Sequence, residues 1–435
     1  MYPNLYYFFK DLFGVEWNAF KLINSFGFFV ALSFIAAAYV LSNELKRKQK
    51  EGLLSYTEQT ITVGAAASTS ELIINFLLGF VLGFKIIGAF LMPDALSNPQ
   101  AFLLSMQGNW LIGIILGGFF CFLKWKEKNK HKLSKLEKRT LRIWPHDRVG
   151  DLVIKAAIYG FLGAKFFDIL EAPASFLNAI AAIKEGKESP AALLFSGLTF
   201  YGGLICAALA IFFYAKKHKI TFIHLCDAAA PALMLAYAIG RIGCQVAGDG
   251  DWGILNSAFI SDTNGNIIHA TNAQFQTALN TNAAYYIAQF GDLSKVQHLA
   301  VQPFWGLPNW MFGYNYLHNV NDAGIALAGC TGNYCTYLPV SVFPTPFYET
   351  IMSLILFAGL WFFRKKFTTA GRLFAVYLFV NGLERFLIEK IRVNATYSLF
   401  GFHPTQAEII SFLLMISGII LYIKAPKFFK KVDKA

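Results

Sequence analysis

The sequence predicts an all-α polytopic membrane protein, a helical bundle of about seven to nine transmembrane helices with an extracytoplasmic insertion. The chain has 435 residues and is 56% hydrophobic, far more than a soluble domain of this length. Stretches of about twenty apolar residues follow one another, and each can cross a bilayer as a helix that satisfies its own backbone hydrogen bonds. One long polar stretch, residues 254–343, interrupts the series.

Candidate spans lie near residues 19–41, 61–91, 109–123, 151–170, 191–214, 223–245, 346–363, 371–391 and 407–424. The second stretch is long enough for a bent helix or for a helix followed by a re-entrant segment. Ahead of the first span, the aromatic residues 1–17 predict an amphipathic stretch in the membrane interface. No cleavable signal peptide is predicted.

The spans and the polar stretch divide the chain into four predicted parts. Residues 1–149 hold the N-terminal amphipathic segment and the first transmembrane helices, and residues 150–253 hold a second set of transmembrane helices. Residues 254–343 form the extracytoplasmic insertion, which is too long for a plain loop and predicts a small subdomain. Residues 344–435 form a C-terminal transmembrane part with a basic cytoplasmic tail.

Basic residues predict how the bundle is oriented. They are concentrated in the stretches 43–50, 124–142, 215–219, 363–367 and 424–435. With nine spans, all of these stretches fall on one side, which the positive-inside rule places in the cytoplasm. Residues 246–343 then face the other side, and they contain Lys295 as their only lysine and no arginine. The N-terminus is therefore expected outside and the C-terminus inside, and the net charge of +12 does not call for a nucleic-acid partner.

Two of the six cysteines, Cys330 and Cys335, lie in a polar part of the insertion. Their short spacing in a segment placed outside the cytoplasm predicts a disulfide. A metal site is the alternative, but no second CxxC motif or histidine pair accompanies these cysteines. We expect no metal ion and no cofactor.

Polar residues gather at the outer ends of the last six predicted spans. Taken singly they have structural explanations: Arg385 and Glu389 form an ordinary helical ion pair, glycines in spans serve helix packing, and His403 is a solvated interfacial side chain. Taken together, arginines and a lysine beside carboxylates predict a cavity for an anionic headgroup, because a guanidinium donates two parallel hydrogen bonds to a phosphate. The sets are Lys165 and Asp168, Tyr201 to Gly203, Arg241 to Asp251, Pro344 to Glu349, Glu384 to Arg392, and His403 to Glu408.

Four motifs in these sets resemble, in order, those of the prolipoprotein diacylglyceryl transferase family. They are "YGGLI" at Tyr201–Ile205, "GRIGCQVAGD" at Gly240–Asp249, "FPTPFYE" at Phe343–Glu349 and "RFLIEKIR" at Arg385–Arg392. They are similar to the family elements "HGGLIG", "GRxGNFxNxE", "HPSQLYE" and "RFxxExxR". The resemblance covers roughly residues 150–253 and 343–424, and residues 254–343 look like an expansion of the family's outer region.

The resemblance implies a multi-pass enzyme of the bacterial cytoplasmic (inner) membrane that acts in lipoprotein maturation. Its substrates would be phosphatidylglycerol and prolipoprotein signal peptides with a lipobox cysteine. The diacylglyceryl group would move to the cysteine thiol, forming a thioether and releasing glycerol phosphate. The implied catalytic residues are Arg241, Arg385, Tyr201, Asp249 and Glu349. The implied phosphatidylglycerol-binding residues are Arg241, Arg385, Gly202, Gly203, Gly240, Gly243, Lys165 and Tyr348.

Several positions depart from the family pattern. Tyr201 and Phe343 stand where the family has histidines, and Pro346 stands where it has glutamine. Cys244 and Ala247 replace the signature asparagines. Tyrosine has an ordinary pKa near 10 and is a poor base at neutral pH, so we expect arginine–phosphate electrostatics to carry most of the catalysis.

Two other functions fit parts of the pattern. A transporter could bind an anionic lipid or solute at the same arginines without making a bond, although transporter sites usually lie at the membrane midplane. A scaffold acting through residues 254–343 would not need Arg241 or Arg385. A mass gain of one diacylglyceryl unit on a lipobox peptide would support the transferase alone.

Overall fold

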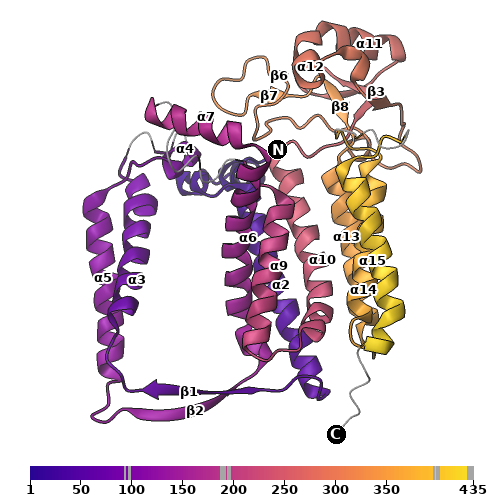
Figure 1. The fold of residues 1–435 in the computed structure, drawn as a ribbon. Coiled ribbons are helices and arrows are strands. Elements are labelled where there is room, and N and C mark those ends of the chain that lie inside the picture. The colour runs from indigo at the N-terminus through magenta and orange to yellow at the C-terminus, as the bar shows by residue number, and fades with distance from the viewer. Residues whose placement is uncertain are drawn as a thin grey trace. The chain divides into compact units, whose positions relative to one another are not determined.

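The structure is a computed structural model that describes residues 1–92, 95–96, 99–186, 193, 197–394, 397 and 402–428. The chain forms two compact units (Figure 1). The first unit contains residues 1–15, 23–44 and 223–435, and the second contains residues 16–22 and 45–222. Each unit has its own helices and its own short strands.

The second unit contains two packed helix pairs. Helix α3 (Thr69–Val81) continues as the π-helical turn η2 (Leu82–Ile87) and packs against α5 (Trp110–Lys130), while α6 (Val149–Glu171) packs against α9 (Phe200–Lys217). The shorter helices η1 (Asn18–Leu22), α4 (Pro99–Leu104), η3 (Pro145–Arg148) and α7 (Pro173–Lys184) complete it. Glycines let the two helices of a pair approach each other closely. In the α3–α5 pair, a Cβ on Gly79 would lie 2.6 Å from the Leu116 carbonyl oxygen. Small residues at helix contacts are typical of bundles in lipid.

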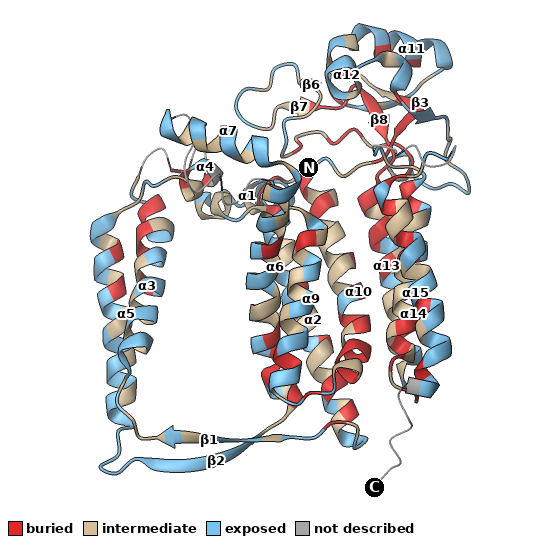
Figure 2. Cartoon of the chain, in the orientation of Figure 1, coloured by how far each residue is buried: buried red, intermediate tan, exposed pale blue. Residues whose placement is uncertain are grey.

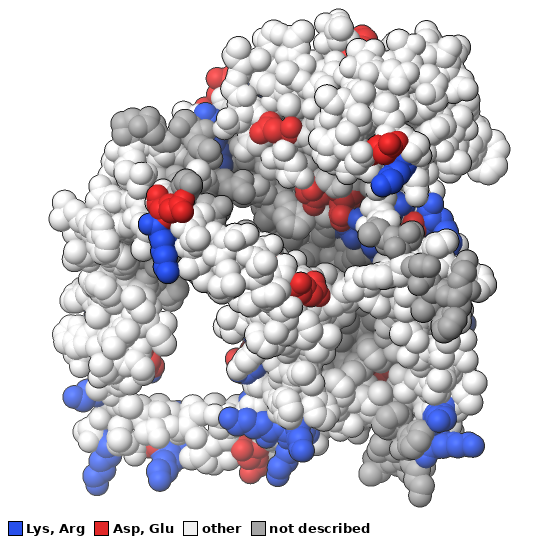
Figure 3. All heavy atoms as spheres, turned by 45° about the horizontal axis from the view of Figure 1, so that its top comes forward, with Lys and Arg blue, Asp and Glu red and all other residues white. Residues whose placement is uncertain are grey.

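Two strands that lie far apart in the sequence pair to form a basic antiparallel ribbon in this unit. Strand β1 (Thr57–Val63) pairs with β2 (Glu137–Ile143) from Thr57 opposite Ile143 to Val63 opposite Glu137. Lysines and arginines gather over this ribbon and the neighbouring helix ends of the second unit (Figure 3). The second predicted span is therefore wrong at its start, since residues 61–63 are in β1 and the helix begins at Thr69. Strand pairing competes well here because Thr57–Val63 is rich in β-branched residues.

Two predicted basic loops are partly helical. Helix α2 (Ser25–Lys50) runs through residues 43–50, and α5 runs through residues 124–130. Lysine, arginine and glutamate lose little rotamer freedom in a helix, so each helix continues beyond its apolar part. The first span also begins at Ser25 rather than near residue 19. The start of the fifth predicted span, near 191, falls partly outside the described residues, and its helix α9 begins at Phe200.

The first unit joins a helix bundle to a small mixed subdomain. Its helices are α1 (Leu5–Phe13), α2 up to Glu44, α10 (Phe222–Ala247), α13 (Thr345–Phe363), the short η6 (Arg364–Lys366), α14 (Arg372–Glu389) and α15 (Gln406–Phe428). Helix α14 packs against both α13 and α15. The amphipathic segment at the start of the chain forms α1, and its place in the membrane interface stays a prediction.

Buried polar contacts fix the lower end of this bundle. The carboxylate of Asp227 on α10 accepts hydrogen bonds from the Gly371 N–H at 2.9 Å and the Phe374 N–H at 3.0 Å, which caps the start of α14. Glu44 at the end of the α2 segment is buried and lies 3.0 Å from the Arg364 Nε. These pairings hold α2, α10, α13 and α14 in one arrangement.

The insertion, residues 254–343, folds as a small α+β subdomain. Strand β3 (Leu255–Ser261) is central and pairs with β8 (Val340–Val342), with β4 (Ile267–His269) and with β5 (His298–Leu299). Its helices are α11 (Asn272–Thr281) and α12 (Ala283–Phe290), and its core includes Phe275, Tyr286 and Tyr316. Two short helical turns, η4 (Leu293–Lys295) and η5 (Asn309–Met311), flank β5 in the chain.

A disulfide closes the hairpin of β6 (Ile325–Ala326) and β7 (Thr336–Tyr337) within the insertion. It joins Cys330 to Cys335, so the predicted disulfide is confirmed.

The chain is a multi-pass membrane protein, as predicted. In the described part of the chain, six helices are long and apolar enough to cross a membrane: α2, α3 with η2, α9, α10, α13 and α15. The predicted spans in α5, α6 and α14 are also helical, but they carry more charged residues. Large apolar side chains on the helix surfaces are exposed, for example Ile74 and Leu78 at 57% and 61% (Figure 2). Such surfaces are stable against lipid rather than water.

Candidate functional site

Glycines after α10 let three chain segments of the first unit meet. Gly248 and Gly250 have φ angles of +67° and +95°, which residues with a side chain adopt only under strain. Gly253 donates its N–H to the Phe343 carbonyl at 2.9 Å, and a Cβ at Gly253 would lie 2.5 Å from the Ile391 carbonyl oxygen. The segment after α10 is therefore held between the chain that enters α13 and the chain that leaves α14.

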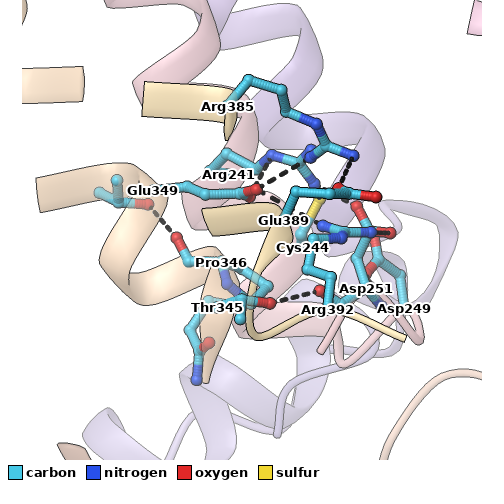
Figure 4. Close-up of polar contacts among 12 residues, drawn as sticks. Arg241, Cys244, Asp249, Asp251, Thr345, Pro346, Glu349, Arg385, Glu389 and Arg392 are labelled. Atoms are coloured by element: carbon cyan, nitrogen blue, oxygen red, sulfur yellow. Dashed lines mark hydrogen bonds and ion pairs between the residues drawn. The ribbon is translucent and has the colours of Figure 1, made fainter. Parts of the chain in front are cut away.

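Three arginines surround two carboxylates at this meeting point (Figure 4). The Glu349 Oε2 lies 2.6 Å from the Arg241 Nε, and the Glu349 Oε1 lies 3.2 Å from the Arg385 Nη1 and 3.4 Å from the Arg392 Nη1. The Asp251 Oδ1 lies 2.6 Å from the Arg392 Nη2, and the Asp251 Oδ2 pairs with the Arg241 Nη1. These five residues are called the arginine cluster below.

The arginine cluster is largely shielded from solvent. The Glu349 side chain is fully buried, and those of Arg241, Arg385 and Arg392 are 15%, 25% and 10% exposed. A buried carboxylate is tolerated only where opposite charge and hydrogen bonds meet it. Glu349 therefore acts as the centre that orders three guanidinium groups from α10, α14 and the segment after α14.

Asp249 and Asp251, which follow α10 in the chain, have pKa values shifted in opposite directions. Burial alone would raise the pKa of Asp251, but the Arg241 and Arg392 guanidiniums outweigh it and hold that pKa at about 2. Burial raises the pKa of Asp249 above its ordinary value. Burial also opposes the charge of Arg392, but the Asp251 carboxylate raises the pKa of Arg392 overall. Asp251 is thus a fixed anion, whereas Asp249 holds a proton more readily.

Arg385 is held from a second side by Glu389 on its own helix. The Arg385 Nη2 lies 3.1 Å from the Glu389 Oε2, the one-face arrangement that the i, i+4 spacing predicts. Glu389 is buried, and its Oε1 accepts hydrogen bonds from the Asn394 side chain at 2.6 Å and the Thr405 hydroxyl at 2.8 Å. The side chain of Arg385 is therefore held in place near the end of α14.

A possible metal-ligand set lies beside the arginine cluster. One ligand atom from each of Cys244, Asp249 and Asp251 lies within 4.8 Å of the others. Asp251 already pairs with Arg241 and Arg392, whose positive charges oppose a cation at this place. The two guanidiniums therefore disfavour a cation at this place, and the expected absence of a metal stays a prediction.

Predicted site residues of the first unit lie around the cluster in different ways. A Cβ at Gly240 would meet no atom within 4 Å, whereas one at Gly243 would lie 3.0 Å from the Phe29 Cβ of α2. Gly243 thus takes part in helix packing. Tyr348 donates its hydroxyl to the Met311 carbonyl of the insertion. Binding roles for these three residues stay predictions.

Predicted site residues of the second unit lie at the contact of α6 with α9. A Cβ at Gly202 would lie 2.4 Å from the Phe167 Cβ, and one at Gly203 would lie 3.0 Å from the Gly160 carbonyl oxygen. Tyr201, next to them in the first turn of α9, is partly exposed. Catalytic or lipid-binding roles for these residues stay predictions.

Lys165 has a partner within the same unit. Its Nζ lies 2.8 Å from the Asp168 Oδ2, one helical turn further along α6. The carboxylate of Asp168 also approaches Gly197, where a Cβ would lie 2.5 Å from the Asp168 Oδ1. A phosphate at Lys165 would have to share this lysine with Asp168.

Sequence reasoning selected three of the five residues of the arginine cluster and passed over Asp251 and Arg392. The spacing of seven residues from Arg385 predicts that Arg392 shares its helical face, but α14 ends at Glu389, and Arg392 reaches the cluster from the segment after the helix. The partnership of Asp251 with Arg241 depends on the turn at Gly248 and Gly250, which spacing alone does not show.

Comparison with protein families shows which family the chain belongs to. The family model for prolipoprotein diacylglyceryl transferase matches residues 99–424, about three quarters of the chain. The chain belongs to the prolipoprotein diacylglyceryl transferase family. The match runs through the insertion and begins before the part that the four motifs cover. All residues of the arginine cluster lie inside it.

Individual members of the family resemble this chain at moderate identity. A phosphatidylglycerol–prolipoprotein diacylglyceryl transferase of Leptospira interrogans is 28% identical over 204 residues, which are 46% of this chain and 42% of that protein. The enzyme of that name from Corynebacterium diphtheriae is 26% identical over 59% of this chain and 70% of its own length. The one from Psychrobacter arcticus is 27% identical over 65% of this chain and 80% of its own. The chain thus spans less than half of the Leptospira relative.

Proposed function

We propose that this protein transfers the diacylglyceryl group of phosphatidylglycerol to the lipobox cysteine of a prolipoprotein. The cysteine sulfur attacks the glyceryl carbon that carries the phosphate, a thioether bond forms, and the carbon–oxygen bond to the phosphate breaks. The electron pair of that bond leaves with glycerol phosphate, and the thiol proton passes to a base. The observation that carries this proposal is the arginine cluster, three guanidiniums ordered on one buried glutamate in a member of this family.

Arg241 and Arg385, joined by Arg392, hold the phosphate in this proposal. Each guanidinium has five N–H donors, and the contacts with Glu349 and Asp251 use only part of them. The phosphate gains charge as the ester bond breaks, so donors aimed at it stabilise the transition state more than the bound lipid. Because the carboxylates fix the guanidiniums beforehand, little reorganisation is needed when that charge develops.

Asp249 is the better candidate for taking the thiol proton, and Glu349 is the poorer one. Both carboxylate oxygens of Glu349 are already engaged by the three arginines. Asp249 has a raised pKa because it is buried, so it binds a proton more readily than an ordinary aspartate. It belongs to the same turn as Asp251 and lies close to the Cys244 thiol. A thiol placed near Cys244 would therefore have a proton acceptor beside the phosphate-binding arginines.

Residues of the second unit contribute to lipid binding in this proposal. Gly202 and Gly203 let α6 and α9 approach each other, which sets the position of Tyr201 at the start of α9. Lys165 adds a positive charge that Asp168 partly balances. Gly240, with open space at its Cα, and Tyr348 would contact the lipid near the arginine cluster, and Gly243 would support Gly240 through its packing on α2.

The proposed location is the bacterial cytoplasmic membrane, with the N-terminus outside and the C-terminus in the cytoplasm. The distribution of basic residues supports this orientation, since they gather at the β1–β2 strand pair in the second unit and at Arg364–Lys366 in the first. Labelling of Asn264→Cys and Lys130→Cys variants with an impermeant maleimide tests it. The Asn264→Cys variant should react in intact spheroplasts and the Lys130→Cys variant only after lysis, and labelling of both from one side would refute the orientation.

The activity is tested with the purified full-length protein, vesicles that contain phosphatidylglycerol and a synthetic lipobox peptide. Mass spectrometry should show a gain of one diacylglyceryl unit on the peptide, with glycerol phosphate as the second product. A peptide in which serine replaces the reacting cysteine is the matched control and should stay unmodified. Binding of phosphatidylglycerol without any mass gain would favour a lipid-binding or transport protein instead.

A further inference from the structure

A cavity of about 630 Å³ opens beside the arginine cluster, within the first unit. Its volume lies in the range of roughly 300–1,000 Å³ that is typical of ligand pockets. The insertion supplies most of its wall, while Asp251 and Arg392 line it from the side of the arginine cluster. The cavity therefore adjoins the proposed phosphate site and shares Asp251 and Arg392 with it, while its other lining residues lie outside the arginine cluster.

The cavity has an apolar floor and a polar rim. The floor consists of Leu255, Tyr286, Leu338, Val340 and Val342, all of them buried. Trp252, Tyr285 and Phe290 add aromatic surface, and the exposed amides of Gln289, Asn321 and Asn394 lie at the rim. Aromatic side chains are enriched at surfaces where proteins bind other polypeptides.

The charges of the lining argue against a second anionic headgroup. Asp251 and Asp322 line the cavity, and among the described residues that line it Arg392 is the only arginine or lysine. Arg392 already contacts Asp251 at 2.6 Å and Glu349 at 3.4 Å, and the pKa of Asp251 is held at about 2, so its carboxylate stays ionised. The lining therefore carries a net negative charge, which favours a neutral or cationic ligand.

We propose that this cavity binds the polypeptide segment that follows the reacting cysteine of the prolipoprotein. The inference rests on the proposed function and names where its second substrate is held. The diacylglyceryl donor reaches the arginine cluster from the bilayer, whereas the polypeptide beyond the cysteine must leave the bilayer, because its irregular backbone needs hydrogen-bonding partners. The rim amides offer such partners, and the floor accepts an apolar side chain.

The lining predicts a charge preference in that segment. Lysine or arginine after the cysteine should bind more tightly than aspartate or glutamate, because Asp322 and Asp251 line the cavity. Asp322 lies at the exposed rim and outside the arginine cluster, so Asp322→Asn should reduce this preference without disturbing the proposed phosphate site.

Filling the opening tests the assignment. Gln289 is an exposed rim residue of α12, and Gln276 is an exposed residue of the neighbouring α11 that does not line the cavity. Gln289→Trp and the matched control Gln276→Trp therefore place the same indole on the same subdomain, inside and outside the opening. Both substitutions are at exposed helical positions, so both variants should fold.

Binding is measured without turnover, by fluorescence anisotropy of two labelled peptides with the full-length protein in detergent. The long peptide carries the lipobox and ten residues beyond the cysteine, and the short peptide ends at the residue after the cysteine. The long peptide should bind the wild type and Gln276→Trp alike, and Gln289→Trp roughly tenfold more weakly, the change that corresponds to about 1.4 kcal/mol. Equal affinity of the long and short peptides for the wild type, or an unchanged affinity in Gln289→Trp, would overturn the inference. Competition of the long peptide by soluble glycerol phosphate that is lost in Gln289→Trp would show an anion site and also overturn it.

The transferase assay separates this inference from the proposed function. With phosphatidylglycerol vesicles, Gln289→Trp should raise KM for the long peptide and leave kcat and the dependence on lipid unchanged. A wild-type protein that binds the long peptide through the cavity but never modifies it would refute the proposed function and leave the peptide site standing. A transferase whose KM for the long peptide is the same in both variants would refute the site and leave the function standing.

Discussion

The arginine cluster of the first unit and the α6–α9 contact of the second both contain residues of the four family motifs. Different interactions hold the residues in place at these two positions. In the cluster, Arg241 and Arg385 meet the buried carboxylate of Glu349, so charge organises the residues. At the α6–α9 contact, Gly202 lies so close to Phe167 that a Cβ has no room, so packing organises the residues. The contrast teaches that within one family an arginine motif can be organised by charge pairing and a glycine motif by close packing.

The strongest test of this comparison is to remove the guanidinium groups of the arginine cluster. Arg241→Gln and Arg385→Gln should each lower transferase activity by about 10²–10³, as loss of a transition-state donor does, and fail to complement a strain that lacks the enzyme. Arg241→Lys keeps the charge but loses the planar fork, so it should be badly impaired too. Peptide mass spectrometry measures the rates.

Arg142→Gln is the control for charge removal, since that side chain is 66% exposed on strand β2. It should retain full activity. Near-normal activity of Arg241→Gln at an unchanged protein level would show that Arg241 does not handle the phosphate.

Asp249→Asn sharpens the comparison by testing proton transfer within the charged region. Activity should fall by about 10², the contribution of a well-placed base. The pKa of Asp249 is raised in the folded protein, so the proton stabilises the fold at low pH. This stabilisation is lost as pH rises from the ordinary value near 3.9 through the raised value. Asn cannot ionise and does not lose this stabilisation. The melting temperature of the variant minus that of the wild type should therefore increase as pH rises.

Melting curves of both proteins across that pH range provide the measurement, with Asp262→Asn as the control because Asp262 is partly exposed and its pKa is lowered by hydrogen bonds from Asn266. Full activity of Asp249→Asn would assign the thiol proton to another group.

A matched glycine pair tests whether packing governs the second region. Gly202→Ala places a Cβ 2.4 Å from the Phe167 Cβ and should destabilise the protein by about 1–3 kcal/mol. Gly240→Ala meets no atom within 4 Å and should be neutral or stabilising by up to about 1 kcal/mol, because alanine favours helix. Thermal unfolding in detergent compares the two. Equal shifts would contradict the packing account, and a raised KM for phosphatidylglycerol in Gly240→Ala alone would support the predicted place of Gly240 beside the headgroup.

The smallest expected effect concerns Tyr201, which stands where the family has histidine. Tyr201→Phe should cost less than about tenfold in rate, because a tyrosine hydroxyl is a weak base at neutral pH. Tyr159→Phe, on the exposed side of α6, is the matched control. An inactive Tyr201→Phe protein with normal stability would mean that the tyrosine hydroxyl has taken the role of the histidine, and the account based on electrostatics would have to be abandoned.

Much of the fold was predictable from the apolar stretches, since each predicted span contains a helix. The errors lie where polar sequence joins spans. Residues 61–63 pair in a strand, and residues 43–50 continue α2, because neither the pairing of distant segments nor the extension of a helix beyond the bilayer is visible in hydropathy. The fold of the insertion and the pairing of its short strands could not be predicted from the sequence either. They depend on contacts such as that of β3 with β8, which are about eighty residues apart in the chain.

Of the candidate site, the sequence identified Arg241, Arg385 and Glu349, because charged residues in apolar helices are costly and these three also match the family motifs. It did not identify Asp251 as their partner or the cavity beside Arg392. Those depend on the positive φ angles at Gly248 and Gly250 and on the close approach of Gly253 to the chain after α14.

The sequence by itself determined that this chain is a multi-pass member of its family with arginines near the ends of its apolar helices, because hydropathy and motif order are local properties. Only the tertiary structure decided which charges meet and which glycines pack. Glu349 collects three arginines because α10, α13 and α14 end at one place, and Gly202 meets Phe167 because α6 and α9 cross there. Coulombic pairing and steric contact both depend on distances of a few ångströms between residues far apart in the chain, and such distances exist only in the folded protein.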